Sequence, residues 1–498
     1  MSILKELGQP YEFWDYFEEI SKIPRCSGNE DEIRVYIKNQ ADKLGFNTKV
    51  DKVGNLVVRI PSISKERHRI ILQCHMDMVC EKNEATSHDF TKDPLKLKTI
   101  NINDEIWVTA EGTTLGADNG VGISYLLTLM KKIYKKDLEF ESLSFELLFT
   151  VDEEVGLKGA FKIDTDLIEG DYLVNIDSEE DNAFTVGCAG GIVTIFNIKK
   201  EISDISQSED RLIPIKIFIT GLLGGHSGAD IHLGRANALK IMSQILWKLN
   251  DKFPIHIVSI DGGNRNNAIP RESNAMLLIK RENFSEINTY IKELFKEIKI
   301  VFDGIEPKME VIINKIENFI DNKVFSNNFQ EKLLNILYLV PNGPHLMHPR
   351  IKDLVFTSTN FAILNTKNNL IEIIFHQRSM SEYFKYVNWE RLKTLFKLSN
   401  FKTEIIIDSD YPGWTPDFDS KLLALSKDAY KKIFKKDVHI KAIHAGLECG
   451  ILKKHFPKME MISLGPNNKG AHSPDERLQV KSVERIWNFL INLFEKLD

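Results

Sequence analysis

The chain has 498 residues, of which 43% are hydrophobic and 27% are charged, and its formal net charge is −6. This length is too great for one compact core, so we expect two or more domains. The two signs of charge are interspersed, which excludes the basic footprint of a protein that binds nucleic acid or an anionic membrane surface. No apolar run approaches the ~18 residues of a membrane span.

The N-terminus and the cysteines predict a cytoplasmic protein. The first twenty residues contain acidic and aromatic side chains where a signal peptide would have a basic and then an apolar run. The five cysteines are scattered, odd in number and form no CxxC motif. This argues against a disulfide framework and fits a reducing compartment.

The first part of the chain alternates helical and strand-like patterns. Residues 89–104 show neither pattern, and we expect an irregular, exposed insertion there. In chain order, the expected elements are two amphipathic helices within 11–44, paired strands over 47–60, a buried strand at 69–74, a helix at 123–136, and buried strands at 147–150 and 172–176.

From about residue 190 to 410 the pattern changes to two similar α+β sets in tandem, although the sequence shows no clear repeat. A Pro/Gly linker at 412–416 then leads to a closing helix–strand–helix series. We therefore expect one domain built from residues 1–189 and 411–498, interrupted by an inserted domain at 190–410. The expected helices of these regions are at 234–249, 285–295, 328–338, 389–398, 420–434 and 481–497, and the strands are at 191–198, 213–220, 255–260, 275–280, 309–313, 362–364, 370–375, 403–407 and 460–464.

Side chains that bind metals follow four of the expected strands. Ligand sites in open α/β sheets gather at the carboxyl ends of the strands, so these residues are expected to meet. A single acidic turn after a core strand would be unremarkable, but four such ends favour a cluster of oxygen and imidazole ligands. The residues are His75 and Asp77 after the first strand, Asp152 to Glu154 after the second, Asp177 after the third and His472 after the last, and the small-residue loop at 116–121 adds Asp118.

Two imidazoles and three carboxylates exceed the three protein ligands of one catalytic zinc. They suit two divalent ions ~3.5–4 Å apart, bridged by one carboxylate and one hydroxide. Asp118 is the natural bridge, and Glu153 remains as the acid/base that deprotonates the water and protonates the leaving amine. Asp77 is expected to accept the second ring N–H of His75. The candidate ligands are His75, Asp118, Glu154, Asp177 and His472.

The motifs HMDMV (75–79), GADNG (116–120), DEEVG (152–156), NIDSEE (175–180), GGHSG (224–228), GLECG (446–450) and GAHSPDE (470–476) resemble those of the dinuclear zinc aminoacylase/carboxypeptidase superfamily. Within it, the chain is most similar to the aminoacyl-histidine dipeptidases, nearly end to end and in the same motif order. The resemblance implies an α/β fold: a zinc-peptidase-like catalytic domain with a mixed, mostly parallel sheet between helices, interrupted by an inserted α+β lid domain.

The same resemblance assigns roles to individual residues. His75, Asp118 and Asp177 would bind one metal ion, and Asp118, Glu154 and His472 the other. The expected ions are two Zn²⁺, with Mn²⁺ or Co²⁺ as alternatives because these ligands accept several metals. In the inserted domain, His226 would stabilise the oxyanion, and Asn267 and Arg378 would bind substrate, with Arg378 on the free carboxylate. Glu448 lies in a family motif but receives no role.

We therefore predict a cytoplasmic, metal-dependent dipeptidase of broad specificity, acting on small dipeptides without nucleic-acid or membrane partners. Relatives in the superfamily are often dimers, which makes a homodimer an expectation. The alternatives are an N-acyl amino acid deacylase or carboxypeptidase on the same scaffold, and a metal-binding scaffold without turnover. GGHSG could also be a simple flexible turn, and Arg378 a surface ion-pair residue. The other histidines are expected to be structural.

Overall fold

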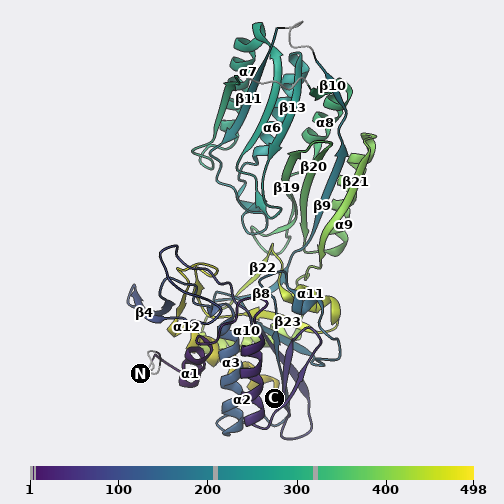
Figure 1. Ribbon diagram of the computed structural model, residues 1–498. Helices are drawn as coiled ribbons and strands as arrows, with labels where there is room; N and C mark the ends of the chain where they lie inside the picture. Colours follow the sequence, from purple (N-terminus) through teal and green to yellow (C-terminus); the bar gives the residue numbers. More distant parts are fainter. Residues whose placement is uncertain (1–3, 5–6, 206–210, 318–322) are drawn as a thin grey trace. The chain divides into compact units, whose positions relative to one another are not determined.

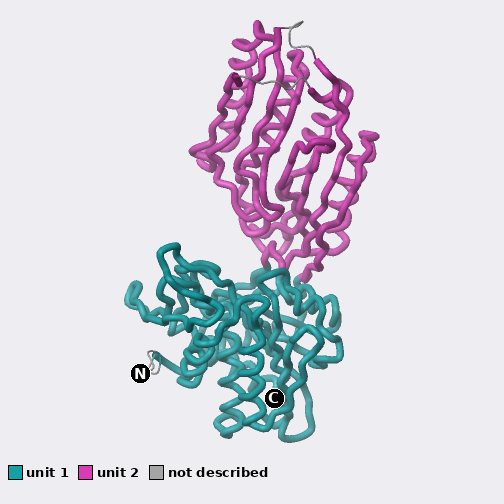
Figure 2. The backbone as a smooth tube through the Cα atoms, viewed as in Figure 1, with its two compact units in different colours: residues 1–187, 416–442, 447–498 teal, residues 188–415, 443–446 magenta. Residues whose placement is uncertain are grey.

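A computed structural model describes residues 4, 7–205, 211–317 and 323–498. These residues form two compact units (Figure 2). Unit 1 contains residues 1–187, 416–442 and 447–498, and unit 2 contains residues 188–415 and 443–446. Among the described residues, no helix is long and apolar enough to cross a membrane.

Unit 1 is built on a mixed eight-stranded sheet with a parallel centre (Figure 1). β3 pairs in parallel with both β6 and β7, and β7 pairs in parallel with β23, whereas the outer pairs β1–β2 and β2–β6 are antiparallel. In sheet order the described strands are β1 (Asn47–Val50), β2 (Leu56–Ile60), β6 (Leu143–Thr150), β3 (His68–His75), β7 (Tyr172–Ile176), β23 (Glu460–Leu464), β8 (Ala183–Cys188) and β22 (His439–Ile443).

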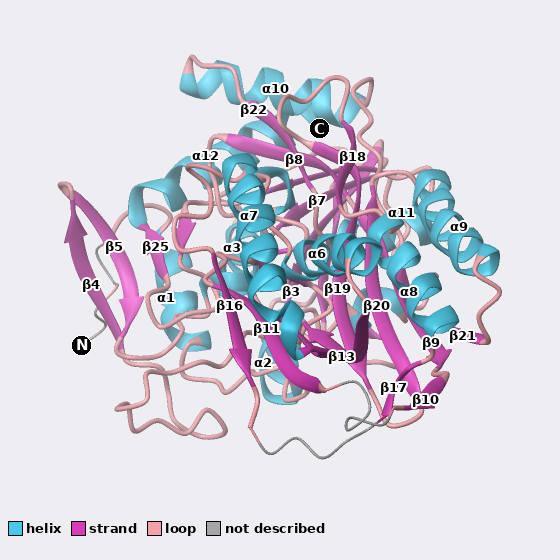
Figure 3. Ribbon diagram, turned by 90° about the horizontal axis from the view of Figure 1, so that it is seen from above, coloured by secondary structure: helices cyan, strands magenta, loops and turns pink. Residues whose placement is uncertain are grey.

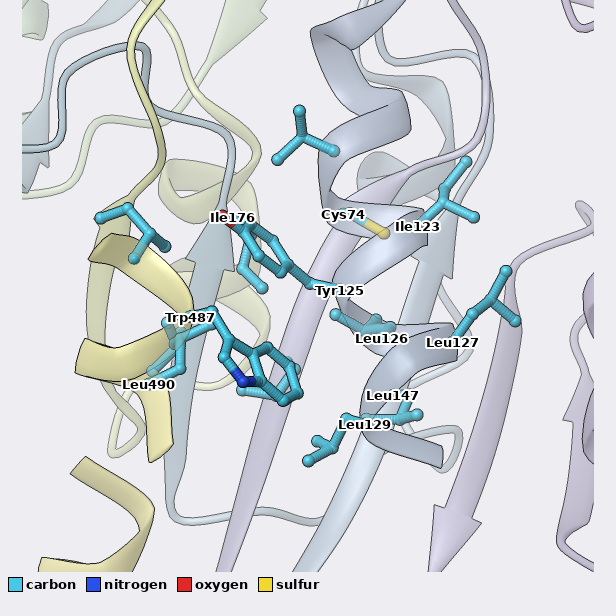
Figure 4. Close-up of a cluster of buried hydrophobic side chains, with 14 of the residues drawn as sticks. Cys74, Ile123, Tyr125, Leu126, Leu127, Leu129, Leu147, Ile176, Trp487 and Leu490 are labelled. Atoms are coloured by element: carbon cyan, nitrogen blue, oxygen red, sulfur yellow. The ribbon is translucent and has the colours of Figure 1, made fainter. Parts of the chain in front are cut away.

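The two faces of this sheet differ because side chains alternate along each strand. Leu72 and Cys74 of β3 enter the main hydrophobic core. Gln73, between them, points to the opposite face and donates a hydrogen bond to Glu448 of α11. Figure 4 shows the core around α3, where Tyr125 stacks on Trp487 of α12 at a ring-centroid distance of 6.2 Å. The helices of unit 1 are α1 (Tyr11–Ile20), α2 (Asp31–Lys43), α3 (Ala117–Tyr134), α4 (Lys158–Phe161), α10 (Lys421–Phe434), α11 (Glu448–His455) and α12 (Val480–Leu497).

The expected insertion at 89–104 was wrong in part, because β4 (Leu97–Ile102) begins within it. β4 pairs with β5 (Glu105–Ala110) in a four-stranded sheet completed by β25 (Arg477–Gln479) and β24 (Asn468–Lys469). No β4 residue is fully buried, so the strand lacks the apolar alternation by which a half-buried strand is recognised. The expected helix at 234–249 also starts later: α6 begins at Ala238, after Asn237, whose side chain caps the N–H groups of Leu239 and Lys240.

Unit 2 is a nine-stranded antiparallel sheet with its helices on one face (Figure 3). The two α+β sets expected in tandem therefore share one sheet. Alternate residues of β11 are buried beneath these helices, as in a sheet covered on one side. The described strands of this sheet are β16 (Glu310–Lys315), β11 (Leu212–Thr220), β15 (Ser273–Lys280), β13 (Ile255–Gly262), β19 (Val355–Thr366), β20 (Leu370–Ser379), β9 (Gly190–Lys199) and β21 (Thr403–Tyr411), with β18 (Gly343–Met347) beside β19. The described helices are α6 (Ala238–Lys252), α7 (Phe284–Val301), α8 (Asn327–Leu339) and α9 (Glu382–Leu398).

Two short pairings complete unit 2 within the described residues. β10 (Ile202–Asp204) pairs with β17 (Lys323–Phe325), and β12 (Gly225–His226) pairs with β14 (Ala268–Ile269). The second pairing sets His226 opposite Ala268, next to Asn267. Single-turn 3₁₀ helices at Ile231–Leu233 and Arg281–Asn283 lead towards α6 and α7.

Candidate metal centre

All five predicted ligands meet at the carboxyl edge of the unit 1 sheet. Their ligand atoms form two groups of three that share Asp118: one with His75 and Asp177, the other with Glu154 and His472. Within each group the atoms lie within 4.8 Å of one another. The five residues come from β3, the N-terminus of α3, and the loops after β6, β7 and β24, so the site exists only in the folded unit.

Asp118 lies between the two histidines. Its Oδ1 is 2.8 Å from Nε2 of His75, and its Oδ2 is 3.1 Å from Nε2 of His472. Asp177 Oδ1 is 3.4 Å from the same His75 nitrogen, and Glu154 Oε2 is 3.1 Å from that of His472. Each carboxylate oxygen of Asp118 therefore belongs to a different group, as a bridging ligand requires.

The residues fit a pair of divalent cations. Atoms that share a tetrahedral ion at ~2.0–2.2 Å lie roughly 3–3.5 Å apart. Three of the separations given above, at 3.1, 3.1 and 3.4 Å, fall in this range, and the fourth is 2.8 Å. Oε1 of Glu154 is buried without a hydrogen-bond partner in the described structure, so an acceptor remains for a cation. Burial opposes protonation of His75, but Asp177 and Asp118 nevertheless raise its pKa well above the ordinary value. A cation here would balance the same carboxylates and leave the imidazole neutral.

Asp77 positions several parts of the centre at once. Its Oδ1 lies 3.2 Å from Nδ1 of His75, as predicted, and also accepts the main-chain N–H of Glu153 at 3.0 Å. Its Oδ2 accepts the main-chain N–H of Glu154 and the hydroxyl of Ser27. Burial opposes the charge of Asp77, but the His75 hydrogen bond and charge outweigh it and lower the pKa of Asp77 to about 2.

Glu153 lies beside the two clusters that share Asp118 and belongs to neither of them. It can join a group with His75 and Glu154, and its side chain has no hydrogen bond to any residue that the structure describes. Burial raises the pKa of Glu153 well above the ordinary value, with Asp177 and Glu448 adding to the rise. A carboxylate that holds a proton more readily than usual, beside a metal cluster, suits an acid/base role.

Sequence reasoning missed the residues that shape the Asp118 loop. The carboxylate of Glu476 accepts the main-chain N–H groups of Leu115, Gly116 and Asp118 at 2.7–3.1 Å. Arg25, also buried, donates to the carbonyl of Gly116 on the same loop. Gly116 has a φ of 66°, and a Cβ there would lie 2.6 Å from the Arg25 guanidinium, so only glycine fits. These are long-range hydrogen bonds to main-chain atoms, and no local sequence pattern predicts them.

Glu448 received no role from the sequence and lies buried beneath the cluster. Its Oε2 accepts from Gln73 Nε2 at 2.6 Å and from the Thr150 hydroxyl at 2.8 Å, and Gln73 in turn accepts from Asn175. Glu448 therefore connects β3, β6 and β7 near the ends that carry the candidate ligands. Burial raises its pKa to about 7.

The three predicted substrate residues lie together in unit 2. Ser227, next to His226, accepts from the guanidinium of Arg378 at 3.4 Å, and its main-chain N–H donates to the carbonyl of Asn267 at 2.7 Å. Nδ1 of His226 accepts two main-chain N–H groups, so its proton is on Nε2, which can donate. Burial lowers the pKa of His226 and keeps the ring neutral.

Arg378 is buried, with 3% of its surface exposed, and the alternative of a surface ion-pair residue is wrong. It donates to the Tyr411 hydroxyl at 2.6 Å, and within the described part of the chain no salt bridge joins it to a carboxylate. Tyr411, which the sequence reasoning also missed, lies 3.0 Å from Nε2 of His376. A buried guanidinium without an anion is a ready site for one.

The cysteines depart from expectation. Cys26 and Cys80, 54 residues apart, form a disulfide beside the metal centre, although the scattered cysteines argued against a disulfide framework. Cys74, Cys188 and Cys449 are buried. Neither the spacing of the pair nor its sequence context distinguishes it from the other three.

An α/β unit that gathers two imidazoles and several carboxylates at the ends of its parallel strands has the architecture of a metallopeptidase. The chain belongs to peptidase family M20/M25/M40, whose sequence profile matches residues 71–496. It is 34% identical to the cytosol non-specific dipeptidase of Escherichia coli over 100% of this chain and 99% of that protein.

Solved structures agree with this family. The aminoacylhistidine dipeptidase of Vibrio alginolyticus superposes with a TM-score of 0.88 at 34% identity, covering 98% of this chain and 97% of that one. The aminopeptidase PepT of Bacillus cereus, at 14% identity, has a TM-score of 0.59 over 99% of each chain, and shows the fold alone. The family and the fold class predicted from the sequence are confirmed.

Proposed function

We propose that the protein is a metal-dependent dipeptidase of broad, aminoacyl-histidine type. The observation that carries this proposal is the pair of three-residue clusters sharing Asp118, with the carboxylate of Glu153 beside them and without a hydrogen-bond partner among the described residues. The names of the two full-length relatives, a non-specific dipeptidase and an aminoacylhistidine dipeptidase, support dipeptides as the substrates. The division into a catalytic domain and an inserted lid is part of the proposal.

His75, Asp118 and Asp177 would hold one divalent ion, and Asp118, Glu154 and His472 the other, with Zn²⁺ preferred and Mn²⁺ or Co²⁺ as alternatives. When bound, such ions polarise a carbonyl and lower the pKa of water. Glu153 takes the proton of the attacking water and delivers it to the leaving amine. Asp77 holds His75 and the main chain of Glu153 in place throughout.

The unit 2 residues would recognise the substrate. His226 donates its Nε2 proton to the oxyanion, which its neutral state and fixed tautomer support. Arg378 binds the C-terminal carboxylate with its planar guanidinium, and Asn267, whose side chain is exposed beside His226, adds a further contact. The requirement for a free carboxylate close to the scissile bond would set the length of the substrate.

The location and assembly are proposed on comparison alone. A cytoplasmic location rests on the name of the Escherichia coli relative, and the homodimer rests on the resemblance to the superfamily. Light scattering after size exclusion measures the assembly directly.

Hydrolysis of a substrate panel, with Zn²⁺ or Mn²⁺ supplied, tests the function. The panel contains β-alanyl-histidine, several α-dipeptides, a tripeptide and an N-acetyl amino acid. We expect cleavage of dipeptides only. Cleavage of the acetylated substrate or the tripeptide instead would favour the deacylase or carboxypeptidase alternative. No turnover with metal bound would favour the scaffold.

Glu153→Gln is the matched variant for this panel, with Asp152→Asn as its control. Loss of a general base lowers kcat by about 10²–10⁴-fold, and the metal content should not change. Asp152 has a φ of 52°, which asparagine also accepts, so the control preserves the loop while removing a neighbouring charge. Equal losses in both variants would contradict the assignment of Glu153.

A further inference from the structure

The segment that joins α1 to α2 reaches three of the loops that carry candidate ligands. Arg25 donates to the carbonyls of Met76 and Asp77 at 3.1 and 3.0 Å, and also to that of Gly116. Glu30 accepts the main-chain N–H of Asp152 at 3.0 Å. Residues 25–30, which we call the anchor segment, therefore contact the loops of His75, Asp118 and Glu153.

The anchor segment is covalently joined to the first of these loops. Cys26 forms a disulfide with Cys80, five residues beyond His75. Around this disulfide the two segments of the chain run in parallel. Cys26 forms an isolated β-bridge with Met78, and the main-chain N–H of Met78 donates to the carbonyl of Arg25 at 3.0 Å. The Ser27 hydroxyl donates to Asp77 at 2.7 Å. The disulfide thus spans the contact through which the anchor segment holds Asp77.

The two bonded cysteines also differ from the others in accessibility. Cys26 and Cys80 are half-buried, whereas Cys74, Cys188 and Cys449 are buried. The bonded pair is therefore less deeply buried than the other three cysteines, and access is a condition for thiol–disulfide exchange.

We propose that Cys26 and Cys80 form a site of reversible thiol–disulfide exchange that controls the metal affinity of the centre. Its co-reactants are low-molecular-weight thiols and disulfides of the glutathione class. The consequence for peptide hydrolysis rests on the proposed function, but the consequence for metal binding does not.

The exchange balances in two steps. A thiolate attacks one sulfur of the pair, the Cys26–Cys80 bond breaks, and a mixed disulfide forms while the other cysteine leaves as a thiolate and takes up a proton. A second thiolate then attacks the mixed disulfide, the remaining cysteine leaves and is protonated, and the small disulfide is released. The cystine gains two electrons and two protons, and two small thiols are oxidised to one disulfide; oxidation of the protein is the reverse.

Reduction removes the covalent restraint but leaves the hydrogen bonds of the anchor segment to form by themselves. Ser27 would then hold Asp77, and Glu30 would hold Asp152, less firmly. Loss of a partner that orients metal ligands lowers metal affinity by about 10–100-fold. We expect the dithiol form to bind a divalent ion about tenfold more weakly than the disulfide form.

The experiment uses the full chain stripped of metal. One sample is oxidised with glutathione disulfide and another reduced with a phosphine, and both are desalted before use. Thiols are counted under denaturing conditions, where the sequence predicts five in the reduced chain. The affinity for Co²⁺ is measured by competition with a chelator. The proposal expects two fewer thiols and about tenfold tighter binding after oxidation.

Three variants make the result specific. Cys26→Ser/Cys80→Ser should bind Co²⁺ with the affinity of the reduced protein, and oxidation should not change that affinity. Cys26→Ala/Cys80→Ala repeats this test without added hydroxyls. Cys188→Ser, in unit 2, should keep the full response. Circular dichroism verifies that each variant is folded.

Two outcomes would overturn the proposal: five thiols remaining after oxidation, or Co²⁺ affinities that agree within twofold between the two states. Since neither outcome involves a peptide substrate, a failure of the dipeptidase assignment would be seen separately, in the substrate panel.

Discussion

Asp77 accepts the main-chain N–H of Glu153 at 3.0 Å through the same Oδ1 atom that faces Nδ1 of His75 at 3.2 Å. One carboxylate oxygen therefore orients a candidate metal ligand and fixes the backbone of the candidate base. The position of Glu153 relative to the metal cluster therefore depends on the side chain of Asp77. It also depends on the strand ends that carry His75 and Glu153.

Asp77→Ala should weaken metal binding and catalysis together. Removal of a carboxylate that orients a metal-binding histidine costs about 10–100-fold in affinity or activity, and here the main-chain N–H of Glu153 also loses its acceptor. The metal affinity and activity of Asp77→Asn should lie between those of the wild type and of Asp77→Ala, because the amide keeps one acceptor oxygen. Metal content and kcat/KM measure both effects, with exposed Asp137→Asn as the control. Native metal content and activity in Asp77→Ala would refute this.

Glu476→Ala should destabilise unit 1 and reduce metal binding. Its carboxylate accepts three main-chain N–H groups of the Asp118 loop, and a buried donor left unpaired costs about 1–3 kcal/mol. We expect the free energy of unfolding to fall by about 2–4 kcal/mol, as measured by denaturant unfolding of the metal-free protein. Asp475→Asn changes the exposed neighbour and should have little effect. Equal stabilities for the two variants would contradict the role of Glu476.

The contrast between Asp118 and Glu476 shows what the sequence could predict. The small-residue loop, the apolar strands and the polar residues that end them are local features, and they were sufficient to find all five residues that the structure gathers in the two clusters. Glu476 acts on main-chain atoms some 360 residues earlier in the chain, and Arg25 acts on carbonyls of two other loops. Bonds to the main chain leave no pattern in the sequence, so the supporting contacts needed the structure.

The same reasoning explains the errors in the fold. β4 is an edge strand without a buried face, so its residues lack the alternation that marks a strand. α6 starts at Ala238, where Asn237 caps it, and not at Gly234, where the sequence pattern predicts its start. Strands β8 and β22 were missed for want of long apolar runs, and both join the sheet outside its parallel centre.

Glu448 should make the stability of the metal-free protein depend on pH. Its folded pKa, raised to about 7 by burial, exceeds the ordinary 4.5, so between these values the folded state binds more protons than the unfolded state. The stability that protonated Glu448 contributes at low pH is therefore lost as the pH rises from 4.5 to about 7. In Glu448→Gln, which cannot ionise, the fall in unfolding free energy between pH 4.5 and 7 should be smaller. Parallel profiles for the two proteins would contradict this.

Arg378→Ala should raise KM for dipeptides sharply and relax the discrimination against longer peptides. The guanidinium is buried without a carboxylate partner among the described residues, so a substrate carboxylate would supply its missing counter-charge. Arg378→Lys keeps the charge but loses the planar fork, and should recover only part of the affinity. Both variants are compared on a dipeptide, its C-terminal amide and a tripeptide, with exposed Arg281→Ala as the control. The wild type should prefer the free carboxylate strongly, and this preference should vanish in Arg378→Ala. If Arg378→Ala discriminates between the dipeptide, its amide and the tripeptide as the wild type does, another residue determines the length of the substrate.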